Sequence, residues 1–311
     1  MISVSNLTKY YGDLKAVNDI SFSINEGEIT GLLGPNGAGK TTTLRMLTCY
    51  LKPSQGSILV DNIKTEDNPL AVRELIGYLP ESAPIYGDMI VYDYLSYAAA
   101  LRKISDPKKK ITEMADLCGL REVMHKSVNE LSKGYKQRVG LAHAMIHDPK
   151  ILILDEPTSG LDPNQIIEIR KLIKEIGKRK TVILSTHILS EVEAACDRII
   201  IIDRGNIAAD DYTANLRSSG HSRITVKISG ADFALMRSAL ESINGAGRIN
   251  EESDDSLTCA SVEVGAERDI RPDIFNMVKE KGWTLYEMKL ERQSLENIFR
   301  QLTIGGEGNE A

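Results

Sequence analysis

The sequence contains no long apolar run. Its longest stretch without a charged side chain is the 11 residues from Ile29 to Gly39. Because a helix that crosses a bilayer needs about 20 predominantly apolar residues, we expect no membrane-spanning helix in this chain. The segment from Met1 to Thr8 has neither a basic start nor an apolar block, so we expect no secretory signal peptide.

Cysteine is scarce and scattered. The four cysteines, Cys49, Cys118, Cys196 and Cys259, lie more than 60 residues apart from one another. Structural zinc sites need closely spaced ligand pairs, so this spacing argues against one. We expect the four thiols to be reduced, as in a cytosolic protein.

An excess of basic residues is also missing. The 38 lysines and arginines are outnumbered by 44 aspartates and glutamates, which gives a net charge of −6. Proteins that bind nucleic acid normally present a basic face, so we expect no nucleic-acid partner. The one compact basic run, Lys108 to Lys110, follows Asp106-Pro107 and is expected to start a solvated helix.

What the chain does contain is an alternation of strand and helix patterns over residues 1–216. Its 311 residues suggest about two domains, and its 42% of hydrophobic residues is typical of a globular protein. Residues 1–28 are typical of strands, and residues 84–147 are mostly helical in pattern. Further patterns predict helices over Thr42–Leu51, Asn164–Lys178 and Leu189–Ala195, and strands over Ile29–Leu33, Ile151–Leu154, Thr181–Leu184 and Arg198–Ile202. Such alternation predicts an α/β domain, with a parallel sheet and helices on its faces.

The pattern changes after Leu216. Ser218 to Gly220 has the composition of a linker, and residues 217–303 follow the order strand, helix, strands, helix, strand, with a closing helix around Leu295 to Leu302. This order predicts a small α+β domain of the ferredoxin-like type, which carries −4 of the −6 net charge. We expect residues 304–311 to form a frayed tail.

A phosphate-binding loop follows the strand predicted at Ile29–Leu33. The pattern is Gly34-Pro35-Asn36-Gly37-Ala38-Gly39-Lys40-Thr41, and a predicted helix comes after it. Glycines let consecutive backbone N–H groups surround phosphate oxygens, and the helix adds its positive N-terminal end. We expect Lys40 to reach the β- and γ-phosphates and Thr41 to offer its hydroxyl to Mg²⁺. The loop by itself predicts a nucleotide, with no preference among kinase, GTPase and transport ATPase.

Two carboxylates follow another apolar strand. Ile151 to Leu154 leads directly into Asp155 and Glu156. If this strand is parallel to the phosphate-loop strand and beside it, its carboxyl end opens on the same crevice. Asp155 is then the expected Mg²⁺ partner, through water, and Glu156 can accept a proton from the water that attacks the γ-phosphate.

Between these motifs, Leu131-Ser132-Lys133-Gly134-Tyr135 resembles the Leu-Ser-Gly-Gly-Gln signature of the ATP-binding cassette (ABC) family. Tyr11 resembles that family's adenine-stacking aromatic, although stacking alone leaves GTP open. Ser159 to Asp162 resembles its D-loop, and Thr186-His187 its switch histidine. Taken alone, Tyr11 could be a surface tyrosine and His187 a structural histidine. In the family's order, His187 is expected to contact the γ-phosphate and Asp162 to organise a dimer interface.

Two motifs depart from the family pattern, at three positions. Lys133 and Tyr135 replace a glycine and a glutamine of the signature, and Glu81 replaces the glutamine of the Q-loop. Glutamate can also ligate Mg²⁺ through oxygen, and its charge holds the ion more strongly than an amide does. Lys133 is either a solvated charge or a sensor of the partner's nucleotide. In both the altered signature and the glutamate of the Q-loop, the chain resembles the ATPases of ABC-2-type exporters, including gliding-motility types.

The resemblance implies a P-loop NTPase fold for residues 1–216, with a RecA-like core, an antiparallel β subdomain and a helical subdomain at about 84–147. It implies a homodimer or heterodimer of cassettes that binds two ATP molecules with Mg²⁺ head to tail. Residues Gly34 to Thr42 of one subunit, with Asp155, Glu156 and His187, would face Ser132 and Gly134 of the other. Binding would close the dimer, and hydrolysis would reopen it.

The partner implied is a separate transmembrane permease, docked near Glu81 to Ile104, which would place the chain on the cytoplasmic face of the membrane and move substrate outward. One alternative is a cassette ATPase that serves the ribosome, DNA or iron–sulfur assembly. Another is a regulatory binder that does not hydrolyse ATP, which would predict loss of Glu156 or His187. Both residues are present.

Overall fold

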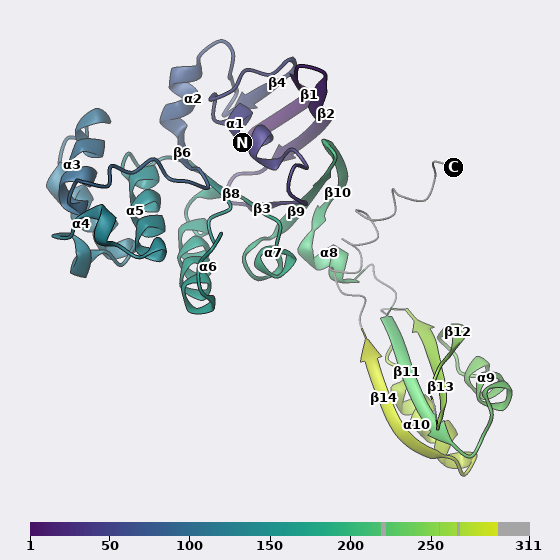
Figure 1. Ribbon diagram of the computed structural model, residues 1–311. Coiled ribbons are helices and arrows are strands. Elements are labelled where there is room, and N and C mark those ends of the chain that lie inside the picture. Colours follow the sequence, from purple (N-terminus) through teal and green to yellow (C-terminus); the bar gives the residue numbers. More distant parts are fainter. Residues whose placement is uncertain (219–221, 255, 266–267, 292–311) are drawn as a thin grey trace. The chain divides into compact units, whose positions relative to one another are not determined.

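The computed structural model describes residues 1–218, 222–254, 256–265 and 268–291. The chain divides into two compact units, Met1–Tyr212 and Thr213–Ala311 (Figure 1). This division lies four residues before the predicted boundary after Leu216. The helix expected around Leu295 to Leu302 and the tail at 304–311 lie outside the described residues, as does most of the expected linker.

The first unit is built on a six-stranded sheet in the order β10-β9-β3-β8-β7-β6, in which only β10 is antiparallel to its neighbour. Three of its strands, β3, β7 and β8, are buried along their whole length. Such continuous apolar strands are typical of a parallel sheet that is covered on both faces. The strands are β3 (Ile29–Leu33), β6 (Ile76–Leu79), β7 (Ile151–Asp155), β8 (Thr181–Thr186), β9 (Arg198–Asp203) and β10 (Asn206–Tyr212).

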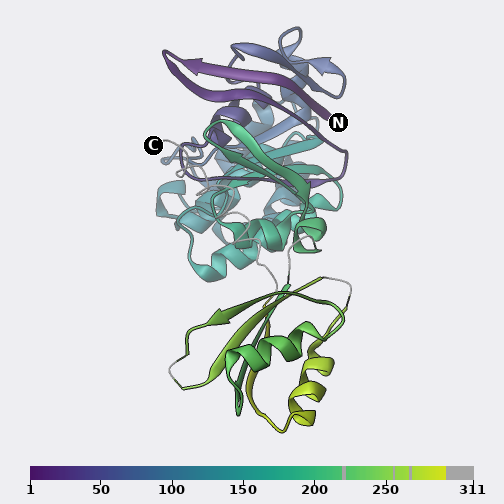
Figure 2. The same ribbon diagram turned by 90° about the vertical axis from the view of Figure 1, so that its right-hand side faces the viewer.

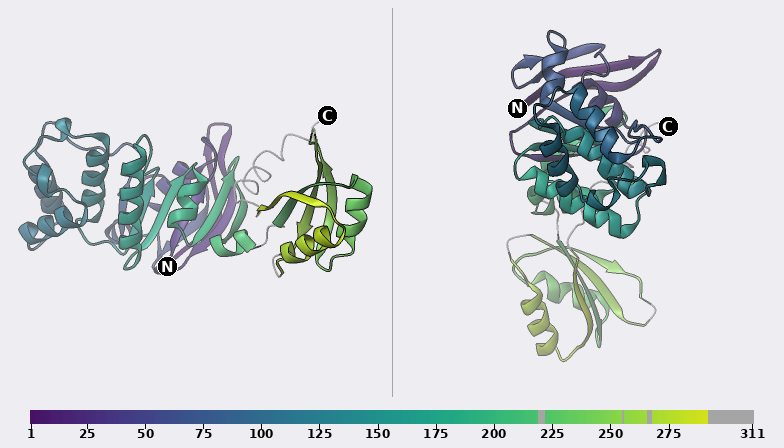
Figure 3. Two further views of the ribbon diagram at one scale, coloured as in Figure 1. Left: turned by 90° about the horizontal axis from the view of Figure 1, so that it is seen from below. Right: turned by 90° about the vertical axis from the view of Figure 1, so that its left-hand side faces the viewer.

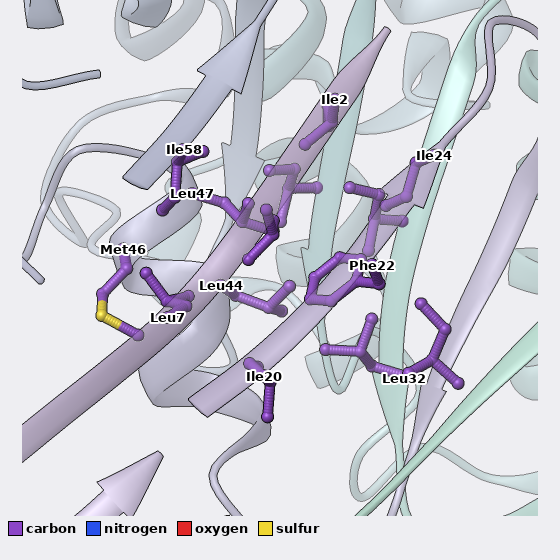
Figure 4. Packing of buried hydrophobic residues seen from close by; sticks show 14 of the residues in the cluster. Ile2, Leu7, Ile20, Phe22, Ile24, Leu32, Leu44, Met46, Leu47 and Ile58 are labelled. Carbon is purple, nitrogen blue, oxygen red and sulfur yellow. The ribbon is translucent and has the colours of Figure 1, made fainter. Parts of the chain in front are cut away.

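A second, antiparallel sheet has the order β2-β1-β4-β5. Helix α1 (Lys40–Leu47) belongs to the same apolar core as strands of both sheets. Figure 4 shows its Leu44 and Leu47 in one cluster with Ile2 of β1 and Leu32 of β3. The core therefore holds the helix that follows the phosphate loop in a fixed position. The strands of this sheet are β1 (Ile2–Tyr11), β2 (Leu14–Ile24), β4 (Gln55–Val60) and β5 (Ile63–Lys64).

Helices α3, α4 and α5 gather beside the β6 edge of the large sheet and form a helical subdomain (Figures 1 and 3). Helix α3 begins only at Val91, after Ile90, so the expectation of helix from residue 84 is wrong for its first turns. Helix α1 ends at Leu47 rather than Leu51, because Cys49 takes a left-handed φ of 56°. The helices are α2 (Pro69–Leu75), α3 (Val91–Leu101), α4 (Pro107–Leu117), η1 (Arg121–Val123), η2 (Val128–Glu130), α5 (Lys133–Met145), α6 (Pro163–Gly177) and α7 (Leu189–Ala195).

The second unit contains a four-stranded antiparallel sheet in the order β12-β13-β11-β14. Its apolar face packs against α9 and α10, through residues such as Val226, Met236 and Ile274 (Figure 2). The β-α-β-β-α-β connectivity and this strand order are those of a ferredoxin-like fold. The elements are α8 (Thr213–Ser218), β11 (Ser222–Ser229), α9 (Phe233–Glu241), β12 (Ala246–Glu252), β13 (Thr258–Val264), α10 (Arg271–Glu280) and β14 (Thr284–Glu291).

Throughout the part of the chain that the structure describes, every helix falls short of the length and apolarity that a membrane crossing requires.

Candidate functional site

The phosphate loop connects β3 to α1 and has the backbone of an anion cradle. Gly37 and Gly39 take left-handed φ angles of 81° and 106°. A Cβ at Gly39 would lie 2.6 Å from the carbonyl oxygen of Ala16, so only glycine fits there. The Lys40 ammonium donates to the carbonyl oxygens of Gly34 at 2.8 Å and Pro35 at 3.1 Å. The lysine is thereby held inside the loop.

The strand that ends in Asp155 is not the neighbour of the phosphate-loop strand, which corrects our expectation. Strand β8 lies between β3 and β7. The two motifs still meet, since the Thr41 hydroxyl donates to Asp155 Oδ1 at 3.1 Å. The physical reason is that α1 packs against β7 and so carries Thr41 across the end of β8.

Ser185, on the intervening strand β8, ties the two carboxylate residues together. Its hydroxyl donates to Asp155 Oδ1 at 2.5 Å and accepts the backbone N–H of Glu156 at 3.0 Å. Glu156 takes a left-handed φ of 48°, which is costly for a residue with a side chain. Ser185 is fully buried, and our sequence reasoning missed it. The available signal was the pair of hydroxyl residues, Ser185 and Thr186, that follows the apolar run from Val182 to Leu184.

Glu156 lies between two other predicted residues. Its Oε2 is 3.0 Å from His187 Nδ1, and its Oε1 is 3.5 Å from Lys40 Nζ. Oε1 is buried and has no hydrogen-bond partner among the described residues. A buried acceptor without a partner is costly, so this oxygen is suited to a proton donor brought by a ligand, such as a water molecule.

The turn that carries His187 is fixed by the residue before it. The Thr186 hydroxyl donates to Glu191 Oε2 at 2.7 Å and accepts the N–H of Ile188 at 3.0 Å. His187 itself keeps 45% of its side chain exposed. The imidazole is therefore held at the surface of the site on a rigid turn.

A cavity of about 480 Å³ lies over these groups. Its lining includes ten of the predicted site residues and two that our sequence reasoning missed, Leu14 and Ala16. It also includes Ser159, which we expected only as part of the D-loop-like segment. The Ser159 hydroxyl donates to Glu81 Oε1 at 3.5 Å, which joins the Q-loop position to the D-loop segment. The predicted residues in the lining are Tyr11, Asn36, Gly37, Gly39, Lys40, Thr41, Thr42, Glu81, Glu156 and His187.

The remaining predicted residues do not line this cavity. Gly34, Pro35 and Ala38 form the back of the loop, and Asp155 reaches the site through Thr41. Asp162 caps α6, where its carboxylate accepts the N–H groups of Asn164 and Gln165 at 3.0 Å.

The signature residues lie at the start of another helix. Ser132 caps α5 by accepting the N–H of Tyr135 at 3.4 Å. Gly134 lies so close to Gln165 that a Cβ would be 2.6 Å from its side chain. The Lys133 ammonium lies against Gly160. Neither Ser132 nor Gly134 faces the nucleotide cavity of its own chain.

The described groups fit a nucleoside triphosphate with a divalent cation. The loop offers N–H groups and a helix N-terminus to phosphate, and Lys40 adds a buried cation. Thr41, Asp155 and Glu81 are oxygen donors of the kind that Mg²⁺ prefers. Tyr11 is 44% exposed at the cavity edge and offers an aromatic face to a base.

Comparisons with known proteins agree with this chemistry. The family model described as "ABC transporter" matches residues 17–159. The YhcH ABC transporter ATP-binding protein of Bacillus subtilis is 34% identical over 306 residues, which cover 97% of this chain and 96% of YhcH. The bacitracin transport ATP-binding protein BcrA of Bacillus licheniformis is 32% identical, with 98% of each chain covered. The solved structure of cbiO1 from Clostridium perfringens, part of the cbiONQ ABC transporter complex, gives a TM-score of 0.65 at 32% identity and covers 70% of this chain and 90% of cbiO1.

The chain therefore belongs to the ATP-binding proteins of ABC transporters. It is an ATP-binding, ATP-hydrolysing subunit of a transporter, and its first unit has the cassette fold. The dimeric structure of the cassette MJ0796, bound to ADP and Pi, is similar at 26% identity with a TM-score of 0.63, and covers 68% of this chain and 99% of that one. The alternative, a cassette that serves soluble machinery, finds no support in these comparisons.

Proposed function

We propose that this chain uses Mg²⁺ and ATP to drive export of a substrate through a separately encoded permease. The observation that carries the proposal is the Glu156 carboxylate, held between Lys40 and His187 beside the phosphate loop. The transport part of the proposal is supported by relatives that match this chain along nearly their whole length. These include BcrA and the linearmycin resistance ATP-binding protein LnrL of Bacillus subtilis, which is 30% identical over 97% of this chain and 98% of LnrL.

In this proposal each group has a defined task. The loop N–H groups and Lys40 hold the β- and γ-phosphates, and Tyr11 stacks on adenine. Thr41, Asp155 through water, and Glu81 hold Mg²⁺, which neutralises charge on the β- and γ-phosphate oxygens. Glu156 accepts the proton of the attacking water, and His187 contacts the γ-phosphate and orients Glu156.

The complete site needs a second cassette. Ser132 and Gly134 of one subunit would contact the γ-phosphate held by the other, and Asp162 would organise the interface between them. The proposal is supported by the position of Ser132 and Gly134 away from the cavity of their own chain. ATP binding would close a head-to-tail homodimer or heterodimer, and hydrolysis would open it.

The permease would dock beside the helical subdomain, near Glu81 to Ile104, and hold the chain at the cytoplasmic face of the membrane. Two neighbouring cavities there, of about 370 and 450 Å³, share Tyr50, Tyr78 and His143. Tyr78, which lines both cavities, lies near the proposed metal carboxylate, because burial and the charge of Asp155 raise its pKa to about 12. We assign residues 217–303 as a small accessory domain.

A substitution of the proposed base tests the catalytic part. Glu156→Gln keeps the shape of the side chain but removes its basicity, and we expect ATP turnover to fall at least about 100-fold. The ATP-bound dimer should then accumulate, as a shift in size-exclusion chromatography that depends on ATP. Glu175→Gln, on the exposed surface of α6, is the matched control. Unchanged turnover in Glu156→Gln would overturn the assignment of the base.

Co-purification tests the transport part. The full-length tagged chain should be recovered from detergent-solubilised membranes together with a polytopic membrane protein. A chain that purifies free of any membrane protein from those membranes would contradict the proposed role.

A further inference from the structure

The direction of the His187 ring depends on its backbone more than on packing around it. The side chain is 45% exposed. Among the described residues, the ring hydrogen-bonds only to Glu156, at 3.0 Å between Nδ1 and Oε2. A half-exposed ring can rotate into solvent, so its direction depends on the turn between β8 and α7 that carries it. Any group that holds this turn therefore helps to place the imidazole against Glu156.

The Thr186 hydroxyl closes this turn around His187. Its oxygen accepts the backbone N–H of Ile188 at 3.0 Å, so the residues on both sides of His187 are joined. A side-chain bond to the backbone two residues along restricts the dihedral angles of the residue between them. The hydroxyl donates its own proton to Glu191 Oε2 at 2.7 Å. The carboxylate thereby fixes the rotation of the hydroxyl and keeps a lone pair facing the N–H of Ile188.

Glu191 is more deeply buried than its place in a helix requires. It lies in the first turn of α7, where an acidic side chain interacts favourably with the positive end of the helix. An exposed carboxylate would supply that interaction equally well, yet Glu191 is 3% exposed. Burial of a carboxylate is costly unless hydrogen bonds and a counter-charge compensate for it. The burial therefore indicates a second task for Glu191, which is the bond to Thr186.

The counter-charge comes from the neighbouring helix. Arg170 of α6 places Nη2 at 3.9 Å from Glu191 Oε1, and α6 packs against α7. Glu191 Oε1 and Arg170 Nε are both buried and have no hydrogen-bond partner within the described ranges. The two charges therefore attract each other without a directional bond. In the described part of the chain, Oε2 is the carboxylate oxygen that is fixed in direction, and its partner is Thr186.

We propose that Glu191 is a positioning residue for His187. Its buried carboxylate, with Arg170 as counter-charge, holds the Thr186 hydroxyl, and this hydroxyl holds the backbone that aims the imidazole at Glu156 and at the γ-phosphate. The inference rests on the proposed function, in which His187 contacts that phosphate, and it adds the residues that set the direction of the ring. A ring that is oriented in advance loses less freedom when the nucleotide binds.

The test separates the hydrogen bond from the bulk of the side chains. Thr186→Val and Glu191→Leu keep the approximate size but remove the bond, whereas Thr186→Ser and Glu191→Gln keep a hydroxyl and an acceptor oxygen. We expect kcat for ATP hydrolysis by the full chain to fall about 10- to 100-fold in the first pair, because a small misplacement of a reacting group costs that much. The KM for MgATP should stay within about twofold, since the phosphate loop is unchanged, and kcat of the second pair should stay within about threefold of wild type.

A double-mutant cycle with His187→Ala shows whether Glu191 acts through the imidazole. By itself, His187→Ala should lower kcat at least about tenfold. In that background, Thr186→Val and Glu191→Leu should lower kcat further by no more than about twofold, because the ring that they orient is gone. A general structural defect would instead multiply the two losses.

Glu28→Leu is the matched control. Glu28 is 7% exposed, accepts the hydroxyl of Thr30 at 3.1 Å and lies 3.6 Å from a guanidinium nitrogen of Arg198. It shares the surroundings of Glu191 but precedes β3, at the opposite end of that strand from the phosphate loop. We expect Glu28→Leu and Glu191→Leu both to melt at a lower temperature than wild type. At an assay temperature below both transitions, kcat of Glu28→Leu should remain within about twofold of wild type.

Wild-type kcat in both Thr186→Val and Glu191→Leu would overturn the inference. Equal fractional losses in the wild-type and His187→Ala backgrounds would overturn it too, and so would a loss of kcat in Glu28→Leu as large as that in Glu191→Leu. Wild-type kcat in His187→Ala would instead contradict the proposed role of His187, and the inference with it.

Discussion

Lys40 Nζ lies 3.5 Å from Glu156 Oε1, and the two side chains are only 6% and 9% exposed. The proposed phosphate-binding cation and the proposed general base therefore neutralise each other inside the site. Removal of either partner from a buried pair leaves an uncompensated charge, which is more destabilising than loss of the whole pair. The first prediction follows from this relationship.

Lys40→Ala should lower the free energy of unfolding of the first unit by about 3 kcal/mol, because Glu156 loses its buried counter-charge. Lys40→Ala/Glu156→Gln should recover part of that loss. The measurement is urea unfolding followed by circular dichroism. Trp283 is the only tryptophan and lies in the second unit, so its fluorescence transition serves as an internal control and should not move. Strictly additive effects of the two substitutions would contradict a coupled pair.

Ser185→Ala should raise the Mg²⁺ concentration that ATP turnover requires, while the affinity for nucleotide changes less. The hydroxyl positions the carboxylate of Asp155 and the backbone of Glu156. Its loss leaves Asp155 Oδ1 with the Thr41 hydroxyl and the Glu156 N–H with the Ser185 carbonyl, so both groups lose one of their two hydrogen bonds. We expect a several-fold higher Mg²⁺ concentration for half-maximal ATP turnover, with fluorescent-nucleotide affinity in excess metal nearly unchanged. Thr186→Val, which removes the neighbouring hydroxyl bonded to Glu191, is the comparison. An equal Mg²⁺ requirement in wild type and Ser185→Ala would argue against the positioning role.

Gly34→Ala should destabilise the first unit by at least about 1–3 kcal/mol through overpacking. The added Cβ would lie 2.2 Å from the carbonyl oxygen of Ile202, and a backbone atom in a buried strand cannot easily move away. Gly265→Ala places its methyl group in open space and is the neutral control. Melting followed by circular dichroism reports the difference, and a Gly34→Ala variant as stable as wild type would show that β9 can shift.

Stability should fall as pH is lowered from about 6.5 toward 4, in part because of His147. Burial first, then the charge of Arg102, lowers the pKa of His147 to about 4. Between that value and the ordinary histidine pKa, the unfolded chain binds a proton that the folded chain does not bind. The stabilisation is therefore complete above the ordinary value and is lost on acidification.

In His147→Gln, the free energy of unfolding should change less between pH 7.5 and pH 4.5 than it does in the wild type, even though the variant is less stable at neutral pH. The readout is the urea midpoint at a series of pH values. His125→Gln changes an exposed histidine of the same unit and provides the reference slope. If the urea midpoint of His147→Gln fell with pH as steeply as that of the wild type, His147 would not contribute to the loss of stability on acidification.

Much of the site could be predicted from the sequence because its motifs are local. The glycines around Lys40, the apolar strand before Asp155 and the position of His187 each depend on neighbours in the chain. The structure places Lys40, Glu156 and His187 in contact around one cavity. The strand and helix types of β3, β7 and α7 also follow from local periodicity, and the predicted bounds of α7 are those observed.

The tertiary structure decided what local patterns cannot encode. The sequence does not state the order of strands in a sheet, and only the insertion of β8 between β3 and β7 brings Ser185 to Asp155 and Glu156. Likewise, the two cavities that share Tyr50, Tyr78 and His143 exist because α5 and the residues after α1 meet at the β6 edge. Arg73 of α2 and Arg102, directly after α3, line one of them together. Such contacts depend on long-range packing of the core, which fixes the side chains that face each other regardless of their distance along the chain.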